Sequence, residues 1–389
     1  MHRAVLFAVV GVWATASLPL AQAVPQGRAP SPATTNGELL AQRLPRVEYR
    51  SGPFVRRPRV VTITFAEDDP RLVSRLEQFS DIITRTPWWR AVVAGYCAKD
   101  DDCIGEGRSG LSVRLNETLP AEVHAVDISA ILRRHADAGR LGPLDSESLL
   151  LVYLPPAVSL RDASVARYCG DGPRAFHRAL RFDQKAVGYA VMPRCGDEAA
   201  LTATTSHELL EMATSPDPAQ PGFAFVQSSF TRGFTAAGSE AMDPCGLITS
   251  QTDVVEGTFV VRRAWSNRAA SRGHDPCVPA PAERPYVGLV PQQATVRLLN
   301  DGDSVTISLE AAADQPVAGW AVSAVDLTGS QEHEQYVEVA LDKSVVTPGE
   351  TATVRITRRK AHPKHLSVVG IVSTIGADSY LWPVAVVTR

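Results

Sequence analysis

The chain changes its pattern of side chains near Pro279-Ala280-Pro281, and this change divides it into two parts. Before this segment, stretches with helical spacing alternate with β-branched runs, whereas short strand-like segments and turn residues follow it. A chain of 389 residues, of which 44% are hydrophobic, is long enough for two domains that each bury a core. We therefore expect an α+β domain at residues 47–282 and an all-β domain at residues 286–389.

The all-β part has the strand density of a sandwich. About seven short strands in roughly a hundred residues are typical of an immunoglobulin-like sandwich of two sheets. This part holds no cysteine, so a disulfide-linked core of the antibody kind is excluded. The strands are predicted at residues 294–299, 304–309, 320–327, 336–341, 352–356, 366–372 and 380–387.

The beginning of the chain has the pattern of an export signal. An apolar run at residues 4–20 leads to Ala-Gln-Ala at residues 21–23, the small-x-small pattern that a signal peptidase cuts. We expect residues 1–23 to be a signal peptide and residues 24–46, rich in Pro, Ala, Gly and Ser, to be a flexible leader. The protein is then secreted, extracellular or periplasmic, with no membrane span after cleavage. A net charge of -3 offers no basic field for nucleic acid.

The six cysteines form an even set, which in an exported chain is typical of disulfides. A zinc site made of thiolates would need a paired Cys-x-x-Cys, and the sequence has none. Many pairings are compatible with the sequence, and we expect neighbours in order to pair because each pair closes a short local loop. The predicted disulfides are Cys97–Cys103, Cys169–Cys195 and Cys245–Cys277.

One segment before the change of pattern reads as a helix that carries a chemical motif. We expect this helix to run from Glu198 to Met212, with Asp197 as its cap and Ser215-Pro216 as its end. Several threonines make it a poor helix by propensity, so tertiary packing has to hold it.

The motif is His207-Glu208-x-x-Glu211. Residues four apart lie on one face of a helix, so His207 and Glu211 can bind one ion, and Glu208 can reach a water on that ion. This is the arrangement of the His-Glu-x-x-His metalloproteases with the second histidine replaced by a carboxylate, which zinc also accepts. The motif predicts one Zn²⁺ per chain.

Catalytic zinc usually has three protein ligands, so a third is expected from outside the helix. Glu240 and Asp243 lie beside Cys245, and a disulfide there would hold their loop in place. One of the two would bind the ion while the other accepts a hydrogen bond from His207. We favour Glu240 as the ligand, and Asp217 is a further candidate.

Glu208 is the expected general base, which takes a proton from the water and returns it to the leaving amine. A hydrogen-bond donor for the developing negative charge is expected from His177, with Tyr168 and Tyr189 as alternatives. A histidine in the position of His177 is also compatible with an ordinary, partly buried side chain.

Three segments together resemble a known family. They are residues 205–214, the pattern Glu240-x-x-Asp243-x-Cys245, and Trp265-Ser266-Asn267 leading to Cys277. In these segments the chain resembles secreted bacterial proteins with a zincin-like His-Glu-x-x-Glu motif and, more distantly, the plant phosphate-induced EXORDIUM-like proteins. The resemblance covers roughly residues 60–277, and it implies a zincin-like domain with the motif at its centre. The family continues with Thr-Asp-Pro where this chain has Thr214-Ser215-Pro216.

Two classes of function are compatible with the sequence. The first is a secreted zinc-dependent hydrolase, a metallopeptidase that acts on a protein or peptide substrate, free or bound to a surface. The second is a non-catalytic extracellular binding or cell-wall-associated protein whose metal site is degenerate or structural. The sequence leaves the substrate and the oligomeric state open.

Overall fold

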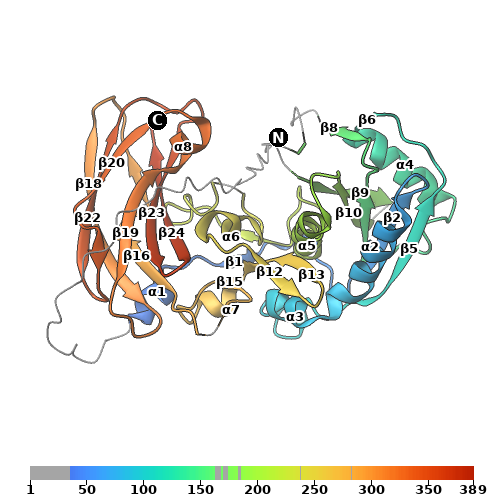
Figure 1. The fold of residues 1–389 in the computed structure, drawn as a ribbon, viewed down its shortest axis with the longest axis horizontal. Helices are drawn as coiled ribbons and strands as arrows, with labels where there is room; N and C mark the ends of the chain where they lie inside the picture. Colours follow the sequence, from blue (N-terminus) through green and yellow to red (C-terminus); the bar gives the residue numbers. More distant parts are fainter. Residues whose placement is uncertain (1–35, 163–167, 170–173, 183–184, 237, 282) are drawn as a thin grey trace. The chain divides into compact units, whose positions relative to one another are not determined.

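The computed structural model describes residues 36–162, 168–169, 174–182, 185–236, 238–281 and 283–389 (Figure 1). The predicted signal peptide and the first part of the predicted leader lie outside these residues. The fold is mixed α/β and divides into two compact units. Unit 1 comprises residues 44–281, and the described part of unit 2 comprises residues 36–43 and 283–389.

Unit 1 is built on one five-stranded sheet. The strands, in spatial order, are β5 (Arg108–Leu115), β2 (Arg59–Phe65), β7 (Ser148–Tyr153), β10 (Lys185–Met192) and β9 (Phe176–Phe182). The first four are parallel to their neighbours, and β9 is antiparallel to β10 at one edge. Every residue of β7 is buried, as expected for a central parallel strand that is covered on both faces.

Helices supply that cover on both faces. α4 (Ala125–Asp137) contributes Ile128 and Leu132 to a core that also contains Val61 of β2 and Val191 of β10. α2 (Pro70–Ile82) lies against β2 and β5, while α5 (Glu198–Thr214) lies against β7, β9 and β10. α5 approaches β10 closely at Gly188, where an added Cβ would lie 3.4 Å from the Cβ of Met212.

α5 is the predicted motif helix, and it extends to Thr214, two residues beyond the expected end. The side chain of Asp197 accepts a hydrogen bond from the N–H of Ala200 and so caps the helix as predicted. Tertiary contacts compensate for its threonines: the Thr202 hydroxyl donates to the carbonyl of Val260, and Ser206 Oγ accepts from the N–H of Arg262. Both contacts tie α5 to β13 (Phe259–Arg262).

Short elements complete unit 1. Five two-stranded sheets are β1 (Val47–Tyr49) with β11 (Phe223–Phe225), β3 (Cys97–Lys99) with β4 (Asp102–Cys103), β6 (Glu122–His124) with β8 (Ser159–Arg161), β12 (Asp253–Glu256) with β13, and β14 (Ala264–Trp265) with β15 (Cys277–Val278). The remaining helices are η1 (Ile83–Arg85), α3 (Pro87–Val93), α6 (Asp243–Ile248) and α7 (Asn267–Ala270).

All six cysteines form disulfides, and all of them lie in unit 1. The pairs are Cys97–Cys103, Cys169–Cys195 and Cys245–Cys277, which confirms the prediction of pairing in order.

Unit 2 consists mainly of two sheets. One has the order β16 (Val287–Pro291), β18 (Ser304–Ala313), β22 (Thr351–Arg358) and β20 (Val337–Leu341). The other has the order β17 (Thr295–Arg297), β24 (Asp378–Val387), β23 (Leu366–Ile375), β19 (Trp320–Asp326) and β21 (Val345–Val346). The sheets contact each other where β16 lies against β23 and β24 and where β19 lies against β20. The seven predicted strands correspond to observed ones, but β16, β21 and the helix α8 (Leu327–Glu332) were not predicted.

The predicted flexible leader, residues 24–46, extends too far toward the C-terminus. Residues Gly37–Arg43 form the helix α1, which lies against β16 and β18 of unit 2. Leu40 is fully buried there, and the burial of this one apolar side chain stabilises a segment whose composition favours a loop.

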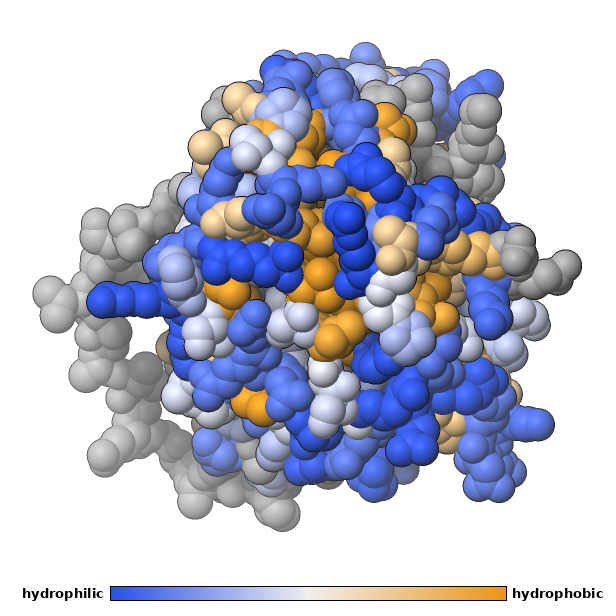
Figure 2. All heavy atoms as spheres, turned by 90° about the vertical axis from the view of Figure 1, so that its right-hand side faces the viewer, coloured by the Kyte–Doolittle hydropathy of each residue, from blue (hydrophilic) through white to orange (hydrophobic). Residues whose placement is uncertain are grey.

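The surface on the side of α4 and β5 is shown in Figure 2, where hydrophobic side chains gather near the middle of a mostly hydrophilic face. Large exposed apolar side chains of these two elements are Leu111 and Val126. Single exposed apolar side chains such as these two are normal on protein surfaces. In the part of the chain that the structure describes, no helix is both long and apolar enough to cross a membrane.

Candidate metal centre

Six side chains with metal-binding groups come together beside α5 in unit 1. α5 contributes His207, Glu208 and Glu211, the edge strand β9 contributes His177, and the segment at the start of α6 contributes Glu240 and Asp243. All six were candidate site residues in the sequence. Two groups of three lie close enough to hold a cation: His177 with Glu208 and Glu211, and His207 with Glu211 and Asp243.

Strand register brings His177 to the site. His177 lies opposite Ala190 in the antiparallel β9–β10 pair, and Ala190 is on the same face of β10 as Gly188, which α5 covers. Cross-strand partners share a face of the sheet. His177 therefore points toward α5, whereas its neighbour Phe176 packs in the core that contains α4 residues.

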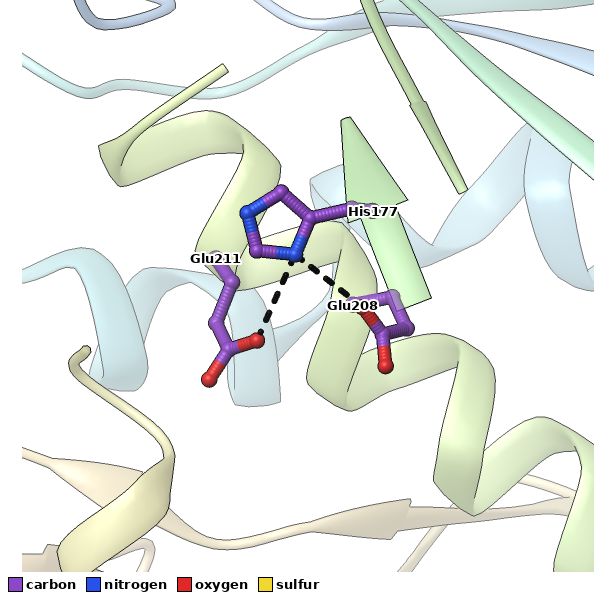
Figure 3. A group of neighbouring side chains, drawn as sticks. All are labelled: His177, Glu208 and Glu211. Atoms are coloured by element: carbon purple, nitrogen blue, oxygen red, sulfur yellow. Dashed lines mark hydrogen bonds and ion pairs between the residues drawn. The ribbon is translucent and has the colours of Figure 1, made fainter. Parts of the chain in front are cut away.

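The imidazole of His177 lies between three carboxylates. Its Nδ1 donates a hydrogen bond to Oε2 of Glu208 at 3.1 Å and lies 3.5 Å from Oε2 of Glu211 (Figure 3). Its Nε2 lies 3.3 Å from Oε1 of Glu240. The side chains of Glu208 and Glu211 expose only 3% and 1% of their surface, so these charges meet in a water-poor environment.

His207 faces the other side of Glu211. Its Nε2 lies 3.0 Å from Oε1 of Glu211 and 4.0 Å from Oδ1 of Asp243. The second oxygen of Asp243 accepts a hydrogen bond from the N–H of Glu240, which fixes the carboxylate. The structure thus groups Asp243 with His207 and Glu211, and it places Glu240, the ligand favoured from sequence, beside His177.

Four buried polar atoms of the cluster have no hydrogen-bond partner among the described residues. They are Nε2 of His177, Nε2 of His207, Oε1 of Glu211 and Oε1 of Glu240. Although His207 and Glu211 are close, their two atoms lack the orientation of a hydrogen bond. Buried polar groups in native proteins nearly always have partners, and unpaired ones call for an explanation such as an ion. An imidazole nitrogen and carboxylate oxygens are the donor set of a divalent transition-metal site.

The acidic groups of the cluster respond to burial and to one another. Burial raises the pKa of Glu211 well above its ordinary value, and the charges of Glu240 and Glu208 raise it further. Burial likewise raises the pKa of Asp243 well above its usual range, with Glu211 and Glu240 adding to the effect. Burial also acts to raise the pKa of Glu240, but the neighbouring His177 outweighs it and the net shift is downward.

The two imidazoles shift in opposite directions. Burial lowers the pKa of His207, so its neutral, metal-binding form is favoured. Burial also acts to lower the pKa of His177, but the carboxylates of Glu240 and Glu208 outweigh it and hold that pKa well above its ordinary value. Without a cation, His177 is the positive group that compensates the carboxylates.

A disulfide holds the segment that carries Glu240 and Asp243, and an arginine of β13 acts on the cluster through its charge. The Cys245–Cys277 disulfide begins two residues after Asp243 and joins α6 to β15. Arg262 of β13, which sequence reasoning missed, lies close enough to lower the pKa of His207 and to oppose the rise at Glu211. Its only sequence signal is its place at the end of a short strand-like run.

Other predicted candidates lie elsewhere. Asp217 forms an ion pair with Arg181 and belongs to neither group of possible ligands. Tyr189 lies opposite Arg178 in the β9–β10 pair and therefore points to the face of the sheet away from His177. Tyr168 packs against Phe176 and is close enough to Glu208 for this charge to raise its pKa, although burial is the larger cause.

Comparison with known proteins gives no family. No protein-family model matches the sequence, and no curated protein matches it. Solved structures that are similar over 27% of the chain include a GH5 xyloglucanase from Bacteroides ovatus (11% identity, TM-score 0.18) and the E. coli chaperone DraB (12%, 0.20). The titin M3 domain is similar over the same share (10%, 0.17). The matched part spans 19% of the xyloglucanase chain, 54% of DraB and 97% of the titin domain.

Proposed function

We propose that the protein is a secreted zinc-dependent hydrolase, a peptidase, with its metal centre on α5. The observation that carries the proposal is the convergence of buried imidazole and carboxylate atoms without hydrogen-bond partners on a His-Glu-x-x-Glu helix. His207, Glu211 and Asp243 are the residues that would hold the ion, with Glu240 as the alternative to Asp243. The three disulfides are compatible with export.

The proposal also assigns a fold family to each of the two units. Unit 1 is proposed to be a zincin-like domain related to the secreted His-Glu-x-x-Glu proteins, because it carries the motif on a helix packed against a mixed sheet. Unit 2 is proposed to be an immunoglobulin-like sandwich, because it consists mainly of two packed and largely antiparallel sheets. Such a unit would position the enzyme on its substrate.

The chain's own residues supply the acid–base chemistry. Zinc in such a centre acts as a Lewis acid and makes a water molecule acidic enough to lose its proton near neutral pH. Glu208 would take this proton and return it to the leaving amine. The hydrogen bond from His177 holds the carboxylate of Glu208 in one orientation.

One observation favours the alternative, a non-catalytic extracellular protein with a structural metal. Glu208 exposes only 3% of its side chain, which restricts a substrate's approach to it. The more exposed members of the cluster are Glu240 at 17% and His207 at 12%, so a substrate would have to enter on their side.

The test combines metal analysis with activity on purified full-length protein. We expect zinc in the wild type, loss of that zinc in His207→Asn, and cleavage of unfolded casein that a chelator abolishes. Glu208→Gln should keep the fold and reduce cleavage by about 10²-fold or more, because it removes the general base. Glu67→Gln, at an exposed position outside the cluster, is the control and should cleave like the wild type.

The outcomes separate the two functions. Full peptidase activity in Glu208→Gln would exclude the proposed base. Zinc-containing protein without any hydrolytic activity would favour the structural alternative. Equal zinc content in the wild type and in His207→Asn would exclude the proposed centre altogether. His333→Asn, at an exposed left-handed position that Asn tolerates, controls for loss of any histidine.

A further inference from the structure

Glu211 lies between two histidines, and each of its oxygens faces a different one. Oε1 is 3.0 Å from Nε2 of His207, and Oε2 is 3.5 Å from Nδ1 of His177. A carboxylate in this position can bridge two cations. His177 and Glu208 lie on one side of it, and His207 and Asp243 lie on the other.

We propose that the centre binds two divalent transition-metal ions, with Glu211 as the bridging ligand. The first ion would use His207, Glu211 and Asp243. The second would use Nδ1 of His177 together with Glu208 and Glu211. This second site rests on the proposed function, because Glu211 belongs to both.

The spacing of the donor atoms fits a second ion. Ligands about 2.0–2.2 Å from a tetrahedral zinc ion lie about 3.3–3.6 Å from one another. Nδ1 of His177 lies 3.1 Å from the oxygen of Glu208 and 3.5 Å from that of Glu211. Figure 3 shows the three groups turned toward a common point, with His177 approaching from its strand and both glutamates from α5. Small shifts would place an ion between them.

The charge of the cluster also favours a second ion. Glu208, Glu211, Glu240 and Asp243 are all largely buried, and the two histidines are neutral when they bind metal. Four ionised carboxylates are balanced by two divalent cations, whereas one cation on the His207 side, with His177 still positively charged, leaves one buried negative charge without compensation.

The outer side of His177 already faces the kind of group that orients a metal-bound histidine. Nε2 of His177 and Oε1 of Glu240 lie 3.3 Å apart, and neither has a hydrogen-bond partner among the described residues. With a cation on Nδ1, the ring would keep a proton on Nε2 for Glu240, which is the usual outer contact of a metal-bound histidine. Glu240 then serves as the partner that orients His177.

Glu208 can still act as the proton acceptor when the second ion is bound. Its Oε2 faces His177, and Figure 3 shows the other oxygen pointing away from that ring. One oxygen would bind the second ion, and the other would remain available for the proton.

Metal stoichiometry tests the proposal without relying on activity. Full-length protein is stripped with a chelator, reloaded with Zn²⁺, freed of unbound metal and measured by mass spectrometry of the metal. We expect about two ions in the wild type and about one in each of His177→Gln and Asp243→Asn, because each variant removes a ligand of one site only. The control His333→Asn should hold as many ions as the wild type.

Each outcome decides a separate question. A wild type with one ion, lost in Asp243→Asn but kept in His177→Gln, overturns the second site and leaves the proposed function standing. One ion that both variants lose means a single shared site, which also overturns the proposal. A wild type without metal overturns both. If circular dichroism shows that His177→Gln does not fold, electron paramagnetic resonance of the Mn²⁺-loaded wild type decides: coupled ions support the proposal, and only isolated ions overturn it.

Discussion

His177 and Glu208 lie 31 positions apart in the sequence, and Nδ1 of the first donates to Oε2 of the second at 3.1 Å. Three local facts produce this contact: the antiparallel register of β9 on β10, the close approach of α5 to β10 at Gly188, and the place of Glu208 on the buried side of α5. The proposed base, Glu208, is therefore oriented by His177 of β9, a strand that lies outside the motif helix.

The position of α5 depends on Ser206, whose fully buried Oγ accepts a hydrogen bond from the N–H of Arg262 at 2.9 Å. Ser206→Ala leaves this backbone donor without its acceptor, and we expect the free energy of unfolding to fall by about 1–3 kcal/mol. Urea denaturation measures the change. The exposed Ser344→Ala should change stability by no more than about 0.5 kcal/mol, and an equal effect of both substitutions would contradict the role of Ser206.

The first turn of α5 depends on Asp197, whose Oδ1 accepts from the N–H of Ala200 at 2.9 Å. Asp197→Ala should reduce stability by about 1 kcal/mol, whereas Asp197→Asn, which can also cap a helix, should have almost no effect. Thermal unfolding of the two variants beside the wild type provides the comparison. Equal losses in both would show that the charge of Asp197, rather than its cap, stabilises this end of the helix.

Much of this arrangement could be predicted from local sequence. The cap and the stop of α5 follow from Asp197 and Pro216 in the sequence, although its threonines make it a poor helix by propensity. The disulfides followed from the short loops that they close. For the ends of α5 the information lies within a few neighbouring residues, and for the disulfides it lies in the order of the cysteines along the chain.

The arrangement of the site could not be predicted in the same way. His177 reaches the cluster through the β9–β10 register, which leaves no mark near His177 in the sequence. From the sequence, Glu240 was favoured over Asp243 as the third ligand. In the structure Asp243 accepts a hydrogen bond from the backbone of Glu240, and this turn directs the two carboxylates to different histidines. The helix α1 was missed because the burial of Leu40 against unit 2 determines it, not its composition.

In unit 2, the carboxyl group of Glu332 contacts Tyr336 and His362. The hydroxyl of Tyr336 donates to it at 2.6 Å, and His362 Nε2 lies 3.2 Å away, so the pKa of Glu332 falls below its ordinary value of 4.5. The same bond raises the pKa of Tyr336 to about 12. Because the pKa of Glu332 is lower in the folded protein than in the unfolded chain, its carboxylate stabilises the fold at pH values above the unfolded pKa. This stability is lost as the pH falls through the folded pKa. Because the pKa of Tyr336 is raised, its hydroxyl stabilises the fold at pH values below 10.0, the ordinary pKa of tyrosine. This stability is lost as the pH rises toward 12.

Glu332→Gln should therefore lower the unfolding temperature at pH 7 and have little effect in strong acid, where the wild-type carboxyl is also protonated. Thermal unfolding between acid and neutral pH measures the difference. In a Tyr336→Phe background the effect at pH 7 should be smaller, because the donor is already absent. A pH-independent effect of Glu332→Gln would show that packing, and not this hydrogen bond, is responsible.

The Cys245–Cys277 disulfide links α6 to β15 close to Asp243, a ligand of the proposed metal centre. It joins residues 32 apart, and removing it as Cys245→Ala/Cys277→Ala should cost about 3–4 kcal/mol in unfolding free energy by the chain-entropy argument. Zinc content should also fall, because Asp243 lies two residues before Cys245 and its loop would lose this link.

Cys97→Ala/Cys103→Ala is the control. It removes a disulfide between residues 6 apart, whose loop carries none of the six cluster residues, so it should cost about 2 kcal/mol and leave zinc content unchanged. Denaturation and metal analysis on both variants provide the test, and an equal loss of zinc in the two would mean that general destabilisation, not the position of Asp243, controls metal binding.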